Sequence, residues 1–252
     1  MRILITGSAS GLGKHLAQSL GGASWNRTDA TSWEQNPDVI IHCAWPARPP
    51  QTSEGLFQYF EDTLELTKRL VQLPHRKFIF LSTAEVYPLD GHSGAESQPI
   101  QTSAVRNVYA ACKLIAESIV DARSRKPLIL RSTGLLGFTA RPSSLIRILK
   151  EDSPALSLTA ESRFYYILHR DVEAFIRLAI EQDLTGIYNV SSSKSITLGE
   201  AAAKYNRRVR WGSYTYDIGR VDNQKIAAIL PSFGKTSLEV IEFYLNLVKN
   251  NG

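Results

Sequence analysis

The sequence predicts an α/β protein built on a doubly wound parallel sheet. Short apolar runs rich in β-branched residues alternate with amphipathic stretches of helical period along most of the chain. This alternation is typical of parallel strands that are covered by helices on both faces. A glycine-rich segment at residues 6–13 follows the first apolar run directly. The chain has 252 residues, 43% of them hydrophobic, which suffices for one large domain with a small addition.

The strands and helices are expected from the period of the apolar residues. Buried strands are expected at residues 3–5, 39–41, 78–81 and 128–130, with a weaker one at 187–190. Amphipathic helices are expected at residues 14–20, 57–73, 108–122 and 172–180. A last amphipathic helix ends the chain, with Leu238, Ile241, Leu245 and Val248 on one face.

The glycine-rich segment has the composition of a phosphate-binding turn. Gly7, Gly11 and Gly13 lie between the first expected strand and the helix after it. Glycine allows a tight turn and a close approach of the backbone to a pyrophosphate, and the helix start offers free N–H groups. Because this segment follows the first strand, we predict a Rossmann-type dinucleotide site that also includes Ser10 and Leu12.

The strand–helix alternation breaks at residues 138–158 and again after residue 191. We therefore predict a dinucleotide-binding core of residues 1–137 and 171–190. Residues 138–170 and 191–252 are expected to form a small, discontinuous substrate-binding subdomain.

Charge and cysteine content limit the classes of partner. The formal net charge is +5, but the densest basic cluster, Lys204, Arg207, Arg208 and Arg210, is short and typical of a solvated surface. We expect no nucleic-acid partner, and a mildly basic protein suits an anionic substrate. The two cysteines form neither a disulfide framework nor a metal-binding pair. No apolar run approaches membrane-spanning length and no leader is evident, so we expect a cytoplasmic protein without a membrane partner.

A tyrosine and a lysine at helical spacing are the first candidates for catalysis. Tyr109 and Lys113 are four residues apart in an expected helix, so their side chains share one face. A nearby ammonium group lowers the pKa of a phenol by stabilising the phenolate. Such a tyrosine can exchange a proton with an alcohol or a ketone.

Several segments resemble the short-chain dehydrogenase/reductases, in particular the extended branch that modifies nucleotide sugars. The run Ser-Thr-Ala-Glu-Val-Tyr-Pro at 82–88 is similar to the segment that follows the fourth strand in that branch. The run Asp-Val-Ile-Ile-His-Cys-Ala at 38–44 is similar to the strand whose end lines the cofactor. Further likeness at residues 130–137 and 188–197 extends the resemblance over nearly the whole chain, and the short segment at residues 22–29 resembles the second strand of the dTDP-4-keto-rhamnose reductase group.

The resemblance implies a role for each residue of the site. Thr83 would hydrogen-bond the reacting oxygen, and Tyr109 would donate or accept the proton. Lys113 would tune Tyr109 and hold the nicotinamide ribose, and Ala44 would line the cofactor. The sequence departs from the pattern at Ser10, where extended members usually have a glycine, and the substrate region is shorter than usual.

The segment after the first helix bears on the choice of cofactor. A basic residue near the end of the second strand pairs with the 2′-phosphate of NADP, whereas an acidic residue accepts from the 2′-hydroxyl of NAD. Arg27 has a position suited to the first role, and Asp29 is expected on the adenine side. The sequence therefore favours NADP, and NAD stays open.

The reaction type also stays open at this point. A reductase or dehydrogenase acting on a nucleotide-activated sugar is the first hypothesis, and an epimerase would use the same three residues. A dehydratase or decarboxylase is a further alternative, since Glu85 is present although Ala84 replaces the aspartate of sugar dehydratases. A non-catalytic NADP-sensing regulator would have no need of the Thr–Tyr–Lys set. Finally, the helices at 57–73 and 108–122 predict a homodimer, because relatives in the family pair through these two helices.

Overall fold

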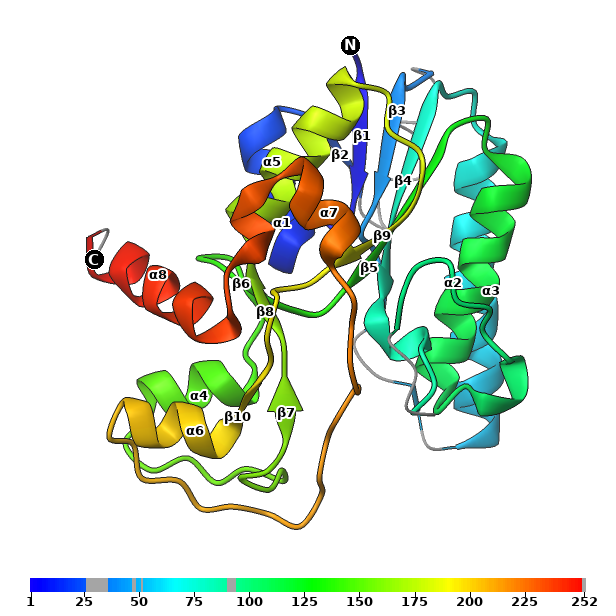
Figure 1. The fold of residues 1–252 in the computed structure, drawn as a ribbon. Helices are drawn as coiled ribbons and strands as arrows, with labels where there is room; N and C mark the ends of the chain where they lie inside the picture. Colours follow the sequence, from blue (N-terminus) through cyan, green and yellow to red (C-terminus); the bar gives the residue numbers. More distant parts are fainter. Residues whose placement is uncertain (26–35, 47–48, 51, 90–93, 251–252) are drawn as a thin grey trace.

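The computed structural model describes residues 1–25, 36–46, 49–50, 52–89 and 94–250 (Figure 1). Its main sheet has six parallel strands in the order β2-β1-β3-β4-β5-β9. Their bounds are Ala23–Trp25 (β2), Ile3–Thr6 (β1), Val39–His42 (β3), Lys77–Thr83 (β4), Pro127–Ser132 (β5) and Gly186–Val190 (β9). The chain proceeds outward from β1 to β2 and then crosses to β3 on the other side, so the sheet is doubly wound as predicted.

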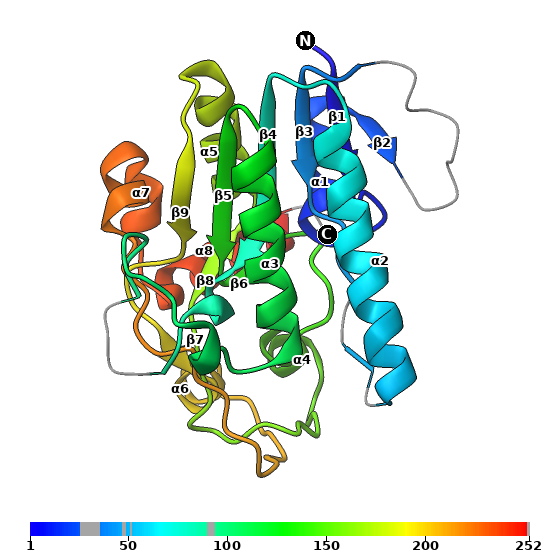
Figure 2. The same cartoon turned by 90° about the vertical axis from the view of Figure 1, so that its right-hand side faces the viewer.

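Helices cover both faces of this sheet. Helix α1 (Gly11–Leu20) contacts α5 (His169–Glu181) on one face, and α2 (Ser53–Gln72) contacts α3 (Val108–Arg123) on the other. Figure 2 shows α2 and α3 side by side in front of the sheet. All five expected strands and all the expected helices are present, which confirms the α/β fold class.

The alternation of side chains along β1 and β3 explains the two layers of core. Ile3, Ile5, Val39 and Ile41 belong to the core cluster shared with α1 and α5. Leu4 and Ile40, the residues between them, belong to the cluster that α2 and α3 cover. Because successive side chains of a strand point to opposite faces, each short apolar run supplies both layers.

A second group of elements lies beyond the carboxyl ends of the main strands (Figure 1). It contains two small sheets and two short helices, namely β6 (Gly134–Leu136) with β8 (Tyr166–Leu168), β7 (Arg163–Phe164) with β10 (Ile196–Thr197), α4 (Ser144–Lys150) and α6 (Leu198–Lys204). Helix α7 (Gln224–Ile229) returns to β9, and α8 (Ser237–Asn250) packs against β8. Short 3-10 helices occur at Ala84–Val86 (η2), Thr102–Ala104 (η3) and Pro231–Gly234 (η4). The predicted division of the chain into core and subdomain residues stays a prediction.

No helix within the described ranges is long and apolar enough to cross a membrane.

Candidate active site

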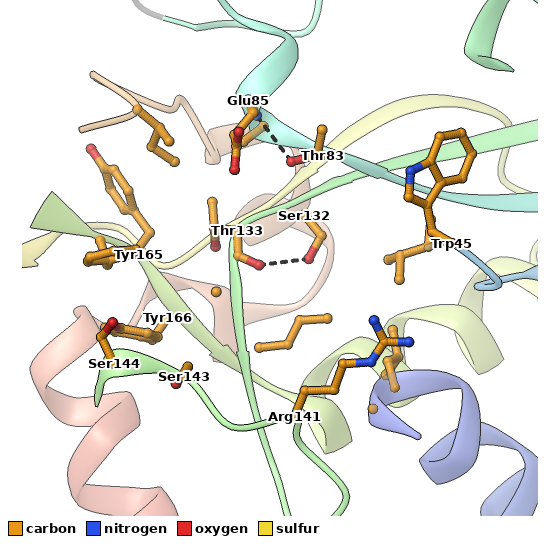
Figure 3. Close-up of a pocket in the computed structure, with 18 of the residues that line it drawn as sticks. Trp45, Thr83, Glu85, Ser132, Thr133, Arg141, Ser143, Ser144, Tyr165 and Tyr166 are labelled. Carbon is orange, nitrogen blue, oxygen red and sulfur yellow. Dashed lines mark hydrogen bonds between the residues drawn. The ribbon is translucent and has the colours of Figure 1, made fainter. Parts of the chain in front are cut away.

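A cavity of about 770 Å³ opens where the carboxyl ends of the central strands face the second group of elements. Ligands of doubly wound sheets bind at this edge, beside the point where the strand order reverses. The glycine turn after β1, the end of β4 and the start of α3 all contribute to the wall, together with β6, β7 and β8. Figure 3 shows side chains around the cavity from the end of β4 and just beyond it, such as Thr83 and Glu85, and from β8, such as Tyr166.

Two glycines of the turn are required by close backbone packing. At Gly7, whose φ is +74°, a Cβ atom would lie 2.7 Å from the backbone nitrogen of Ala44. At Gly13 a Cβ atom would lie 2.3 Å from the carbonyl oxygen of Gly7. These contacts hold the start of α1 tightly against the ends of β1 and β3, where the N–H groups of the first helical turn lack intrahelical partners.

Tyr109 is the second residue of α3 and lies in its first turn, two positions after the N-cap residue Asn107. The side chain of Asn107 caps α3 by accepting a 2.8 Å hydrogen bond from the backbone N–H of Ala110. Burial and the negative charge of Glu85 raise the pKa of Tyr109, while a hydrogen bond with the Thr83 side chain lowers it. The Thr83 hydroxyl accepts a 3.2 Å hydrogen bond from the backbone N–H of Glu85, which leaves its own proton free to point at the Tyr109 oxygen.

Lys113 lies one turn further along α3 and is almost completely buried. Its ammonium group donates a 2.6 Å hydrogen bond to the carbonyl oxygen of Leu81 and lies 3.9 Å from the centroid of the Trp45 indole ring. The same group lies 6.0 Å from the centre of the Tyr109 ring. Burial lowers the pKa of Lys113 to about 7, so the lysine is poised between its two protonation states.

Glu85 is held by donors from two distant segments. Its carboxylate accepts a 3.1 Å hydrogen bond from the Asn107 amide and a 2.9 Å hydrogen bond from the Tyr216 hydroxyl. The ring of Tyr216 stacks on Phe164 with centroids 4.6 Å apart. Burial and the Glu85 charge raise the pKa of Tyr216, so this phenol keeps its proton and donates a hydrogen bond to the carboxylate. The carboxylate therefore lines the cavity in a fixed position beside Tyr109.

The structure brings most of the predicted site residues to one place. Lining the large cavity are Ser10, Gly11, Leu12, Gly13, Thr83, Glu85, Tyr109 and Lys113. A smaller cavity of about 260 Å³ is lined by Gly7, Ser10 and Ala44, along with other residues. Arg27 and Asp29 lie outside the described residues, so the part of the site predicted to read the 2′-phosphate is not placed.

Three further residues of the site were not anticipated from the sequence. Trp45 immediately follows the run at 38–44, and only its position three residues beyond the end of β3 could have indicated it. Arg141 follows β6 and lines both cavities, and Tyr216 comes from the long connection before α7. No local pattern marks Arg141 or Tyr216, because their contacts to the site join segments that are far apart in sequence.

The positions of the two cavities are those expected for the two halves of a dinucleotide. The smaller cavity borders the ends of β1, β2 and β3, which is where an adenosine binds at a sheet of this type. The larger cavity extends from the glycine turn to Tyr109 and Lys113. Ser10, Trp45 and Arg141 line both cavities, so the two spaces meet at the glycine turn and a pyrophosphate would bridge them there.

Comparison with solved structures gives fold relatives that cover nearly the full chain. A dTDP-4-dehydrorhamnose reductase from Bacillus anthracis in complex with NADP is 23% identical, with 85% of this chain and 84% of that chain covered and a TM-score of 0.70. The UDP-glucuronic acid 4-epimerase from Bacillus cereus in complex with UDP-glucuronic acid and NAD is 19% identical, with 98% and 100% covered and a TM-score of 0.74. The dTDP-glucose 4,6-dehydratase DesIV from Streptomyces venezuelae, with NAD and TYD bound, is 18% identical, with 100% and 98% covered and a TM-score of 0.76.

At these levels of identity the likeness establishes the fold, and these three relatives carry names for three different reactions. Comparison with curated proteins gives no match. A family model described as the NAD dependent epimerase/dehydratase family matches residues 25–191, which is more than half of the chain. This match confirms the resemblance to the extended short-chain dehydrogenase/reductases, and the chain belongs to the NAD dependent epimerase/dehydratase family.

Proposed function

We propose that the protein is an NAD(P)-dependent oxidoreductase that reduces or oxidises a carbonyl or hydroxyl group of a nucleotide-activated sugar. The observation that carries this proposal is the meeting of Thr83, Tyr109 and Lys113 in one wall of the cavity that the glycine turn also lines. A dinucleotide bound along the turn would bring its nicotinamide to this wall. A sugar carbonyl would then lie between the nicotinamide and the Tyr109 hydroxyl.

Each residue of the set has a defined part in moving the proton. When bound, the nicotinamide supplies or accepts the hydride. In the direction of reduction, Tyr109 donates its hydroxyl proton to the carbonyl oxygen, and the nearby Thr83 hydroxyl donates a hydrogen bond to the same oxygen. Protonated Lys113 stabilises the resulting phenolate through its charge and is within reach of the nicotinamide ribose. The family likeness supports these roles, and the geometry at the start of α3 is compatible with them.

A reaction with an additional acid–base step is the second candidate, and one observation favours it. Glu85 is held by Asn107 and Tyr216 so that its carboxylate lines the cavity next to Tyr109. A carboxylate in this position could remove or return a proton on the sugar during decarboxylation or dehydration. Epimerisation would use Thr83, Tyr109 and Lys113 without Glu85. A non-catalytic NADP sensor would not require any of these side chains in the cavity.

The cofactor and the state of assembly belong to the same proposal. Arg27 favours NADP on the argument from the 2′-phosphate, whereas fold relatives contain NADP or NAD. We propose NADP as the preferred cofactor, with NAD as the alternative. We also propose that the protein is a homodimer in which α2 and α3 of each copy pack together.

The test is a direct assay with a panel of keto-sugar nucleotides. Purified protein is mixed with NADPH or NADH, and the nicotinamide absorbance is followed for each sugar nucleotide. Oxidation of the reduced cofactor that depends on one sugar nucleotide supports the proposal. If calorimetry detects no binding of NAD or NADP in either redox state, the proposed function is wrong.

A further inference from the structure

The connection between the two cavities contains a cationic side chain that the proposed chemistry does not use. Only three residues, Ser10, Trp45 and Arg141, line both cavities in the part of the chain that the structure describes. Arg141 comes from the segment between β6 and α4, which is predicted to belong to the substrate-binding subdomain, and contacts Ser10 of the glycine turn. Figure 3 shows its guanidinium group pointing toward Trp45 beside the start of α1.

The contacts of Arg141 leave most of its donors available. Its Nε donates a 3.0 Å hydrogen bond to the Ser10 hydroxyl, and among the described residues no carboxylate forms an ion pair with it. Arg147, which lies on α4 and also lines the larger cavity, is different. Its guanidinium forms a two-point ion pair with Glu151, at 2.9 and 3.0 Å, and its remaining nitrogen donates to the Ala155 carbonyl. Of these two arginines, only Arg141 presents unpaired donors where the cavities meet.

The segment that carries Arg141 also occupies a backbone N–H of the glycine turn that could otherwise donate a hydrogen bond to a phosphate. The backbone N–H of Gly11 donates a 2.8 Å hydrogen bond to the carbonyl oxygen of Thr139, and the Thr139 hydroxyl donates to the Gly11 carbonyl at 2.8 Å. One of the N–H groups at the start of α1 is therefore occupied within the protein. Two residues beyond Thr139, the guanidinium of Arg141 brings a full positive charge and several donors to the same place.

The space at Gly11 is consistent with an anion beneath this guanidinium. A Cβ atom added at Gly11 would meet nothing nearer than two side-chain atoms of Arg141, both 3.9 Å away. The positive charge of Arg141 also acts on both side chains of the proton-transfer pair. It opposes the rise in the pKa of Tyr109 and adds to the fall in the pKa of Lys113. Binding of a doubly charged pyrophosphate would therefore offset a repulsion between Arg141 and protonated Lys113.

We propose that Arg141 binds the pyrophosphate of the dinucleotide, replacing the Gly11 N–H that Thr139 occupies and closing the cleft over the cofactor from the substrate side. This inference rests on the proposed function, since it requires a dinucleotide along the glycine turn. It assigns the phosphate contact to a residue from the substrate side of the cleft, more than a hundred residues from the turn itself. Cofactor binding would then be coupled to the position of the segment between β6 and α4, which also lines the larger cavity.

The test compares Arg141→Gln with Arg147→Gln as a matched control. Both variants remove one guanidinium from the wall of the same cavity, but only the first faces the glycine turn. ADP-ribose, which has the pyrophosphate without the nicotinamide, is titrated calorimetrically into each protein. We expect Arg141→Gln to weaken binding roughly 10- to 100-fold, the range for losing a hydrogen bond to a charged group. Arg147→Gln should stay within about twofold of the parent protein, because the charge it removes is already paired.

Two further readouts separate a phosphate contact from a general effect. Added salt should weaken ADP-ribose binding to the parent protein more steeply than binding to Arg141→Gln, because the variant has one charged contact fewer. Arg141→Lys, which keeps the charge but loses the planar donors, should give an intermediate affinity. Thermal unfolding of each variant checks that the fold is intact, and Arg141→Lys serves as the test variant if Arg141→Gln does not fold.

Three results would overturn the inference. Binding of ADP-ribose to Arg141→Gln as tight as to the parent protein, together with a loss of affinity for UDP, would assign Arg141 to the sugar nucleotide. Equal losses in Arg141→Gln and Arg147→Gln would indicate a long-range effect of charge. If the parent protein binds neither ADP-ribose nor any nicotinamide dinucleotide, the proposed function fails together with this inference, whereas the first two results leave the proposed function intact.

Discussion

The ammonium group of Lys113 lies 3.9 Å from the centroid of the Trp45 indole ring. This contact joins the helix that carries Tyr109 to the segment just after β3, at the point where the two cavities meet. A cation against an aromatic face is stabilised by the ring quadrupole, but burial still favours the neutral amine. The protein therefore keeps a lysine whose charge is costly in the absence of an anionic ligand.

Lys113 should make the stability of the ligand-free protein depend on pH. Its pKa is about 7 in the folded protein, below the ordinary value of 10.5. Between these values the unfolded chain holds a proton that the folded chain has released, so the free energy of unfolding rises with pH. Denaturant unfolding of the parent protein and of Lys113→Met, at about pH 7 and about pH 9, measures this rise. The rise should be larger in the parent protein, and an identical pH dependence in Lys113→Met would contradict the assignment.

Two glycine substitutions should separate backbone packing from backbone conformation. Gly13→Ala places a Cβ atom 2.3 Å from the Gly7 carbonyl oxygen, so α1 would have to move away from the turn. We expect a large loss of stability and of dinucleotide binding. A Cβ atom added at Gly11 has no close neighbour. Gly11→Ala should therefore lower the free energy of unfolding by only roughly 1–2 kcal/mol, the cost of a non-glycine residue at positive φ. Thermal unfolding of both variants measures the difference, and equal melting temperatures would show that the approach of Gly13 to Gly7 is not required.

Glu85→Gln distinguishes the two candidate reactions. A simple oxidoreductase should retain turnover within a few-fold, because the glutamine oxygen can still accept from Tyr216. The negative charge of Glu85 raises the pKa of Tyr109, so its removal should lower that pKa and shift the alkaline limb of the pH–rate profile to lower pH. A fall in turnover of roughly 10²–10⁴-fold at every pH would instead assign Glu85 an acid–base step and favour decarboxylation or dehydration.

The homodimer proposal predicts which exposed apolar residue matters for assembly. Ile115 on α3 is 44% exposed, and Phe243 on α8 is 42% exposed on a different part of the molecule. Light scattering should give twice the mass of one chain for the parent protein and for Phe243→Glu. Ile115→Glu should shift the population toward the monomer, because a charge would be buried between the paired helices. A single-chain mass for the parent protein over a wide range of concentration would rule out the dimer.

The sequence was sufficient to predict the main sheet, because the strands are continuous apolar runs and the covering helices are long, with apolar residues at helical period. The last helix, α8, was also predicted, but the shortest elements beyond the sheet were not, since β7 and β10 have two residues each and α4 and α6 have seven. Segments of this length have no measurable period, and tertiary contacts decide their structure.

The residues of the candidate site fall into the same two groups, those that a local pattern predicts and those that only tertiary contacts bring together. Gly7, Gly11, Gly13, Tyr109 and Lys113 could be found because each belongs to a local motif with a characteristic spacing. The contact of Arg141 with Ser10 and that of Tyr216 with Glu85 each join residues 131 positions apart. Such pairs depend on how the late segments fold back over the sheet, which no short pattern encodes.

The central claim is that Tyr109 transfers the proton, and Tyr109→Phe tests it most directly. This change removes one hydroxyl and leaves the ring, whose centroid lies 6.4 Å from that of the Trp45 ring. With the sugar nucleotide identified by the assay above, turnover of Tyr109→Phe is measured along with its affinity for the cofactor. We predict that turnover falls by roughly 10²–10⁴-fold, the range for loss of a general acid–base group, while cofactor affinity stays near that of the parent protein. Near-normal turnover by Tyr109→Phe would contradict the account.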